Sequence, residues 1–95
     1  MSYQIILSSS AERDLKKIDR HSQSESIKAL ADISENPYQA GERLTGGLCD
    51  YWAYHYSVTG SQFRIAYEIR DTKLVVYVLQ IGSRENFYKT LKRRM

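Results

Sequence analysis

The chain has 95 residues, of which 42% are hydrophobic and 26% charged, and its formal net charge is +3. This balance is typical of a folded globular protein and excludes a disordered chain. The length allows one domain, which we expect to span residues 1–95. No apolar run is long enough for a membrane span or a signal sequence, so we expect a cytoplasmic protein without a membrane partner.

The cysteine and histidine content predicts neither a disulfide framework nor a metal site. Cys49 is the single cysteine, which fits a reducing cytosol. His21 and His55 lie far apart in the sequence, so the spacing of a metal-ligand set is missing. We therefore expect no metal and no cofactor.

The two halves of the chain carry opposite charge. Residues 1–50 hold 6 Lys/Arg against 8 Asp/Glu, a net −2, and residues 51–95 hold 8 against 3, a net +5. The basic half also holds most of the aromatic residues. Cations suit phosphates and aromatic faces suit unstacked bases. Strands are rich in aromatics for packing reasons alone, so composition allows nucleic-acid binding without establishing it.

The first third of the chain predicts a strand followed by two helices. Residues 3–7, YQIIL, have the composition of a short strand. Ser9 with Glu12, and then Ser22 with Glu25, have the spacing of capping boxes, and apolar residues at helical spacing follow each of them. The short link between the two segments predicts an antiparallel helical hairpin, whose narrow apolar stripes suit packing on one face of a sheet.

The rest of the chain predicts strands. Residues 38–48 are glycine-rich and loop-like, and after them the hydrophobic period changes from about 3.6 to 2. Residues 51–58 and 63–69 alternate, and residues 74–81 are apolar on both faces, as in a central strand. Residues 83–94 predict a short basic helix or a loosely held tail.

The resulting order, β-α-α-β-β-β with a C-terminal helical segment, predicts an α+β fold. The N-terminal strand joins a three-stranded antiparallel meander, and the helical hairpin lies on one face of the sheet. Strand side chains alternate between faces, so the side chains of one row share a face. If the aromatic rows face the helices, His55 and Arg64 fall on the opposite face, which we expect to stay open. The members of the aromatic rows are Trp52, Tyr54, Tyr56, Val58, Phe63, Ile65, Tyr67 and Ile69.

Five polar side chains are expected to converge on the open face or at its rim: His55, Arg64, Arg84, Glu85 and Tyr88. Each one alone fits an ordinary surface residue. Adjacent strands, however, deliver them to one surface, and a helical turn would place Tyr88 beside Arg84.

This set suits the cleavage of RNA by its own 2′-hydroxyl without a metal. The reaction needs a base near the hydroxyl, cations on the phosphate, and a proton donor for the departing 5′-oxygen. Arginine binds phosphate with a two-pronged guanidinium, histidine titrates in a suitable range, and tyrosine donates a hydrogen bond or stacks on a base. The paired histidines that would identify base and acid are missing.

Two stretches, LTGGLCDYWAYHYSVTGSQFRIAYEI and LVVYVLQIGSRENFY, carry a family resemblance. Over nearly the whole chain the sequence resembles the RelE branch of the RelE/ParE toxins of bacterial toxin–antitoxin pairs. The shared features are a leucine and a glycine before the second strand, an aromatic-R-I-x-Y-x-I third strand, and a fourth strand ending in I-G-x-R-E…Y. The resemblance implies the RelE-like, microbial RNase-like fold. It also implies a cytosolic toxin that enters the ribosome, cuts translated mRNA and is held inactive by a cognate antitoxin.

Three residues take their expected roles from this resemblance. Arg64 matches the family's phosphate-binding arginine on the third strand. Arg84 matches the arginine after the fourth strand that stabilises the transition state. Tyr88 matches the C-terminal tyrosine that orients the 2′-hydroxyl or stacks on the substrate. We count Tyr51 and Lys89, together with the two arginines, as candidate substrate-binding residues.

One departure from the family pattern concerns the general base. Well-known members carry two lysines on the second strand, where this chain has Ala53 and His55. His55 and Glu85 are therefore both candidates for the base. Since the lysine charge is missing, we expect slow cleavage unless the ribosome organises the substrate.

Two other functions fit the same sequence. One is a ParE-like toxin that inhibits DNA gyrase without catalysis, with which the basic tail KTLKRR is compatible. The other is a nucleic-acid-binding domain without activity. The expected partners of an endonuclease toxin are the antitoxin, the ribosome and mRNA. The sequence leaves open whether a toxin–antitoxin complex binds operator DNA.

Overall fold

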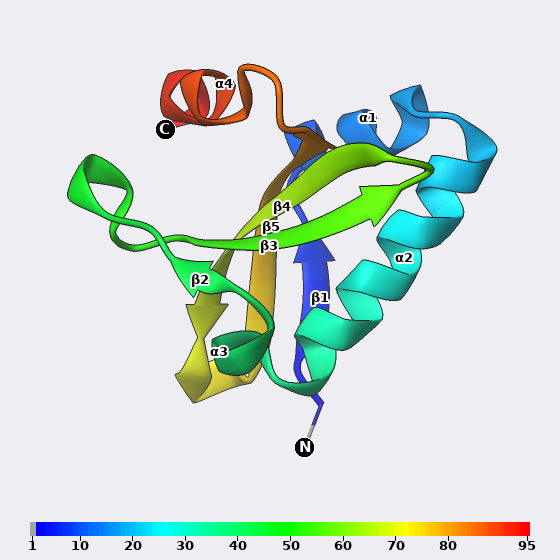
Figure 1. Ribbon diagram of the computed structural model, residues 1–95. Coiled ribbons are helices and arrows are strands. Elements are labelled where there is room, and N and C mark those ends of the chain that lie inside the picture. Colours follow the sequence, from blue (N-terminus) through cyan, green and yellow to red (C-terminus); the bar gives the residue numbers. More distant parts are fainter. Residues whose placement is uncertain (1) are drawn as a thin grey trace.

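The chain forms a five-stranded sheet with helices packed on it (Figure 1). The computed structural model describes residues 2–95. The helices and strands, in chain order, are β1 (Gln4–Leu7), α1 (Ser9–Lys17), α2 (Arg20–Glu35), α3 (Pro37–Ala40), β2 (Glu42–Arg43), β3 (Trp52–Val58), β4 (Ser61–Arg70), β5 (Val75–Ser83) and α4 (Phe87–Arg94). The strand order is β1-β5-β4-β3-β2, with β1 parallel to β5 and the other neighbours antiparallel. The predicted α+β fold is therefore confirmed. The segment predicted as a loop, residues 38–48, in fact holds most of α3, all of β2 and the 3₁₀ turn Gly46–Leu48.

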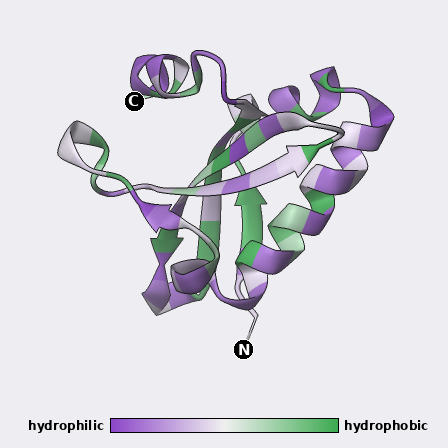
Figure 2. Ribbon diagram, in the orientation of Figure 1, coloured by the Kyte–Doolittle hydropathy of each residue, from purple (hydrophilic) through white to green (hydrophobic). Residues whose placement is uncertain are grey.

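The larger hydrophobic core lies between the sheet and the two long helices. Tyr67 and Ile65 of β4 and Val78 of β5 are fully buried there, against Ile33 and Leu30 of α2. The aromatic rows thus face the helices, which is the condition under which His55 and Arg64 fall on the opposite face. In Figure 2, β1 stands out as a hydrophobic strand beside helices that are more hydrophilic.

Polar side chains of α2 bind the hydroxyl groups at the ends of the β3 aromatics. Tyr56 Oη lies 2.7 Å from Ser26 Oγ, and Tyr54 Oη donates to Asp32 over 2.9 Å. Burial raises the pKa of Tyr56 to about 12, so its hydroxyl stays protonated. These contacts explain why a serine that is fully buried stands on the sheet-facing side of α2.

Both long helices begin earlier than the capping boxes predict. The hydroxyl of Ser8 accepts the N–H of Ala11, and the carboxylate of Asp19 accepts the N–H of Ser22. Ser9 is already helical, and Ser22 lies inside α2, so the predicted capping roles of these two serines are wrong. The reason is that an aspartate or a neighbouring serine caps a helix as well as the predicted residue does. None of the helices described in residues 2–95 is long and apolar enough to cross a membrane.

The face opposite the two long helices is only partly open. Phe87 and Leu91 of α4 are buried there with Leu48 and Ala66. Ala66 pairs with Ala53 across β3 and β4, and two small side chains leave room for the helix above them. The expectation of a fully open face is therefore wrong, and of the two forms expected for the C-terminal segment, the packed helix is the one observed.

Candidate functional site

The hairpin between β3 and β4 fixes the position of His55 and Arg64. Thr59 and Gly60 both have positive φ angles, 50° and 83°, as a two-residue turn between antiparallel strands requires. Pairing counted inward from this turn places His55 directly opposite Arg64. Their side chains therefore share the face opposite α1 and α2.

Arg64 donates a hydrogen bond to His55. Its Nε lies 3.2 Å from Nδ1 of the imidazole. An imidazole nitrogen that accepts a hydrogen bond carries no proton, so the neutral ring keeps its proton on Nε2. The contact occupies one of the five N–H groups of the guanidinium, and the terminal nitrogens remain able to bind an anion.

Tyr88 also contacts the Arg64 guanidinium. The Cζ atom of Arg64 is 5.4 Å from the centroid of the Tyr88 ring, within the range of a cation–π contact. Tyr88 belongs to the first turn of α4, and its ring also packs edge-on against Phe87. A strand from the hairpin and the C-terminal helix thus bring His55, Arg64 and Tyr88 into contact.

The space next to Arg64 on the β5 side is open. Gly82 pairs with Arg64 across β4 and β5. A Cβ atom added to Gly82 would meet nothing within 4 Å. An anion therefore has room to approach the guanidinium from this side.

Arg84 and Glu85 lie at the end of β5, at the rim of this face. The backbone N–H of Arg84 donates to Gln62 O over 2.9 Å, which extends the pairing between β4 and β5 past Ser83. Both side chains are exposed and line a shallow pocket of about 360 Å³ with Gly60, Ser61, Gln62 and Ser83.

The predicted convergence is therefore partial. Within residues 2–95, the Arg84 side chain makes no hydrogen bond or cation–π contact with His55, Arg64 or Tyr88. The expected helical spacing of Arg84 and Tyr88 is wrong, because α4 starts only at Phe87 and the preceding Asn86 has a φ of 57°. Asparagine tolerates this left-handed conformation, which ends any helical relation between the two residues.

The two other predicted binding residues lie on the same face. Tyr51 is half-buried and packs at the border of the small core below α4. Lys89 follows Tyr88 on α4 and is exposed.

The surface around the contact of His55, Arg64 and Tyr88 is cationic. Of the four ion pairs found in residues 2–95, only that of Arg94 with Asp14 involves a cation of α4. Arg64, Arg84 and three further cations of α4 take part in none of these ion pairs and can bind phosphate groups; the α4 cations are Lys89, Lys92 and Arg93, all of them exposed. No three His, Cys, Asp or Glu residues in the described part of the chain form a group that would hold a metal ion.

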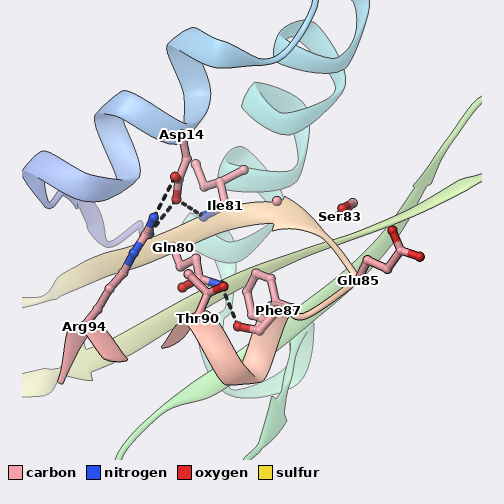
Figure 3. Close-up of a pocket in the computed structure, with 9 residues that line it drawn as sticks. Asp14, Gln80, Ile81, Ser83, Glu85, Phe87, Thr90 and Arg94 are labelled. Atoms are coloured by element: carbon pink, nitrogen blue, oxygen red, sulfur yellow. Dashed lines mark hydrogen bonds and ion pairs between the residues drawn. The ribbon is translucent and has the colours of Figure 1, made fainter. Parts of the chain in front are cut away.

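Sequence reasoning missed the residues that fasten α4. Gln80 is 4% exposed, and its Nε2 donates to Phe87 O over 2.8 Å (Figure 3). A lone amide in the apolar run LVVYVLQIG was a usable signal for a structural hydrogen bond. The ion pair of Arg94 with Asp14 joins residues 80 positions apart, and no local pattern indicates it.

Three comparisons place this architecture among known proteins. Residues 5–92 match the family model described as ParE-like toxin of type II bacterial toxin-antitoxin system. The sequence is similar to a RelE-like toxin protein of Escherichia coli, at 29% identity over all of this chain and 99% of the relative. It is also similar to the mRNA interferase toxin RelE of E. coli K12, at 27% identity over 90% of this chain and 86% of the relative.

Solved structures share the fold. The toxin–antitoxin complex RelBE2 of Mycobacterium tuberculosis matches with a TM-score of 0.80 at 24% identity, over 88% of this chain and 100% of the matched chain. A mutant of the E. coli toxin RelE in the free state matches with a TM-score of 0.72 at 24% identity, over the full length of both chains.

Proposed function

This chain belongs to the ParE-like toxins of type II bacterial toxin–antitoxin systems, and from that premise we propose that it is a ribosome-dependent mRNA endonuclease. The observation that carries the proposal is the Arg64 guanidinium in contact with both the His55 imidazole and the Tyr88 ring, on a strand whose neighbour Gly82 leaves open space. The similarity to an E. coli mRNA interferase over 90% of this chain supports the same reading.

In the proposed reaction the 2′-hydroxyl of a bound nucleotide attacks the adjacent phosphorus. The O2′–P bond forms and the P–O5′ bond breaks, which leaves a 2′,3′-cyclic phosphate and a free 5′-hydroxyl. The 2′-proton goes to a base, and the departing 5′-oxygen takes a proton from a donor. Negative charge builds on the non-bridging oxygens, so fixed cations next to them lower the barrier.

Arg64 and Arg84 are the proposed phosphate ligands. Gly82, opposite Arg64 on β5, leaves open space, and the terminal nitrogens of the Arg64 guanidinium can bind two phosphate oxygens at once. Arg84 stands at the rim without a carboxylate partner in the described chain, and it adds a second cation when substrate fills the surface. Tyr51 and Lys89 extend this surface on the α4 side.

His55 is the proposed base and Tyr88 the proposed stacking and hydroxyl-donating group. The hydrogen bond from Arg64 holds the imidazole in the form whose Nδ1 is unprotonated. When a phosphate draws the guanidinium away, that lone pair is free to accept the 2′-proton. Glu85 is the alternative base, because it is an exposed carboxylate at the same rim.

Ribosomes programmed with a defined mRNA test the proposal. The wild-type protein should cut the message within the codon of the A site, as primer extension would detect. Arg64→Ala, Arg84→Ala and Tyr88→Ala should each slow cleavage, and Lys16→Ala, on the opposite side of the sheet, should not. Absence of cuts with the wild-type protein would refute the proposal.

The choice of base is tested by the pH dependence of the cleavage rate. If His55 is the base, His55→Gln removes the part of the pH–rate profile that reports its titration, and Glu85→Gln leaves the profile intact. The opposite pattern assigns the base to Glu85.

The second candidate function is inhibition of DNA gyrase. It is favoured by the description of the matching family as ParE-like and by the exposed cations of α4, Lys89, Lys92 and Arg93. A supercoiling assay distinguishes the two functions. Gyrase inhibition that survives Arg64→Ala, without any mRNA cleavage, would favour this candidate.

We also propose that a cognate antitoxin binds this chain. Solved structures with the same fold include toxin–antitoxin complexes from M. tuberculosis and E. coli. An acidic segment that covers the cationic face would neutralise it. Co-expression with a gene adjacent to the toxin gene should abolish growth inhibition, and the affinity of the purified pair should fall as salt rises.

A further inference from the structure

The helix that carries Tyr88 is attached to the rest of the molecule at both of its ends. Phe87 follows β5 after a connection of three residues, and Arg94, the last residue of α4, contacts Asp14 of α1. We propose that Asp14 and Arg94 are positioning residues that hold Tyr88 against Arg64. The inference rests on the proposed endonuclease function, in which the contact of Tyr88 with Arg64 forms part of the substrate surface.

The ion pair has a two-pronged geometry and lies in partial shelter from solvent. Arg94 Nη1 is 2.7 Å from Asp14 Oδ2, and Nη2 is 2.9 Å from Oδ1. The two side chains are 26% and 14% exposed, and the hydrogen bonds that Arg94 donates to Asp14 raise the pKa of Arg94 above its ordinary value. Paired, charge-assisted hydrogen bonds of this kind fix orientation as well as distance.

The same two side chains also bind the backbone of β5. Asp14 Oδ2 accepts the N–H of Ile81 over 3.0 Å, and Arg94 Nη1 donates to Leu79 O over 3.3 Å. β1 pairs with β5 only as far as Val78, so these backbone groups lie beyond the end of β1. The ion pair thus joins α1, α4 and the strand that leads into α4.

Polar contacts rather than apolar packing set the distance between α4 and α1. In the described chain, neither hydrophobic cluster contains residues of both helices. A pocket of about 180 Å³, lined by Gln80, Thr90 and Glu85 among others, lies between them. Figure 3 shows the Arg94 side chain reaching from α4 across to Asp14.

Tyr88 depends on this attachment because α4 is short. A helix of eight residues is not stable by itself in water. Its buried anchors, Phe87 and Leu91, and the hydrogen bond of Gln80 to the carbonyl of Phe87 all lie within its first five residues. Arg94, about 9 Å along the axis from Tyr88, fixes the other end and with it the orientation of the helix. Without it, the Tyr88 ring would leave its position 5.4 Å from the Arg64 Cζ atom.

Hydrogen exchange on the full-length protein gives the first test. In Arg94→Ala the backbone amides of residues 87–94 should exchange about tenfold faster, and those of β4 should not change. Lys16→Ala is the matched control, because it breaks an exposed ion pair within α1. In that pair the side chain of Lys16 is 73% exposed and that of Glu12 is 57% exposed. Unchanged exchange of α4 in Arg94→Ala would overturn the proposal.

The second test asks whether Arg94 acts through Tyr88. In a double-mutant cycle on mRNA cleavage, Arg94→Ala should slow the wild-type protein about tenfold or more and have little further effect in Tyr88→Ala. Arg94→Lys keeps the charge but loses the two-pronged geometry, so its rate should fall in between. Fully additive losses would show that Arg94 acts independently of Tyr88, and would overturn the positioning role.

A third measurement separates this inference from the proposed function. A 3-fluorotyrosine placed at position 88 should shift its ¹⁹F signal toward that of a solvated tyrosine in Arg94→Ala and Asp14→Asn, and not in Lys16→Ala. If the wild-type protein cleaves no mRNA, the proposed function fails, and this signal still decides whether the ion pair positions Tyr88. A signal that does not move in either variant would end the inference.

Discussion

The two faces of the sheet differ in what holds them together. The face under α1 and α2 is a continuous core, in which the fully buried residues include Ile33, Ile65 and Tyr67. The opposite face has a small core under α4 and, beside it, the contact of Arg64 with His55 and Tyr88. The helix-covered face therefore supplies most of the apolar burial, and the other face leaves charged groups accessible. Substitutions on the two faces should separate stability from activity.

The largest loss of stability should come from the helix-covered face. Ile33 is 0% exposed, and Ile33→Ala leaves a cavity between α2 and the sheet. The expected cost is about 2–5 kcal/mol of unfolding free energy, measured by urea denaturation. Molecules that remain folded should cleave mRNA at the wild-type rate. A cost below about 1 kcal/mol would mean that this face can collapse around the cavity.

Arg64→Ala should have the opposite effect, a large loss of mRNA cleavage with little loss of stability. Loss of the guanidinium removes the proposed phosphate ligand, so mRNA cleavage should slow by about 10²–10³-fold. Unfolding free energy should change by less than about 1 kcal/mol, because Arg64 is only half-buried and its hydrogen bond to His55 is exposed. Arg64→Lys should recover part of the stability but little activity, since an ammonium group cannot bind two oxygens in one plane. Equal cleavage by Arg64→Ala and the wild-type protein would contradict the site.

Leu91→Ala is expected to lower both the unfolding free energy and the rate of mRNA cleavage. Substitutions in the small core under α4 should differ in this respect from those in the large core, which should lower stability alone. Leu91 is 0% exposed and anchors α4. Its truncation should cost about 2 kcal/mol, near the lower end for buried leucines because the cluster is small. mRNA cleavage by the folded fraction should also slow, because Tyr88 belongs to the same helix and its position depends on how that helix packs. A variant that loses stability but keeps full activity would show that α4 does not position Tyr88.

Local patterns explain which parts of this arrangement the sequence predicts. The strict alternation of β3 and β4, together with the two-residue turn at Thr59 and Gly60, is enough to place His55 and Arg64 on one face. The helix-facing core follows from the same alternation. Ser26 sits on the sheet-facing side of α2, and its hydroxyl partner Tyr56 lies 30 positions away, so the reason for a buried serine is visible only in three dimensions.

Long-range polar contacts account for what the sequence does not predict. The position of α4 depends on Asp14 and Arg94, which are 80 positions apart. It also depends on Asn86, whose left-handed backbone separates Arg84 from the helix. Residue types in a window cannot indicate such pairs, because each charge has many possible partners. For this reason the sequence predicts that His55 and Arg64 share a face, and it predicts the arrangement around α4 only in outline.

The smallest expected effect lies at the end of the sheet remote from the site. Asp71 follows β4, about 23 Å along the strand from Arg64, and it accepts hydrogen bonds from the hydroxyls of Tyr38 and Tyr3. These bonds hold the pKa of Asp71 below its ordinary value. Because the pKa is lower in the folded than in the unfolded state, the stabilisation is present above about pH 4 and is lost as pH falls through the folded pKa.

Asp71→Asn should therefore lower the unfolding free energy slightly at pH 7, and the difference from the wild-type protein should shrink below about pH 4. The effect is small because the carboxylate is exposed and screened by solvent. Urea denaturation at a series of pH values measures it, with mRNA cleavage at pH 7 as the control. Unchanged cleavage would show that the hydrogen bonds of Asp71 contribute to stability but not to activity. A loss of cleavage would mean that the two faces are coupled along the strands, contrary to the separation on which the other substitutions rely.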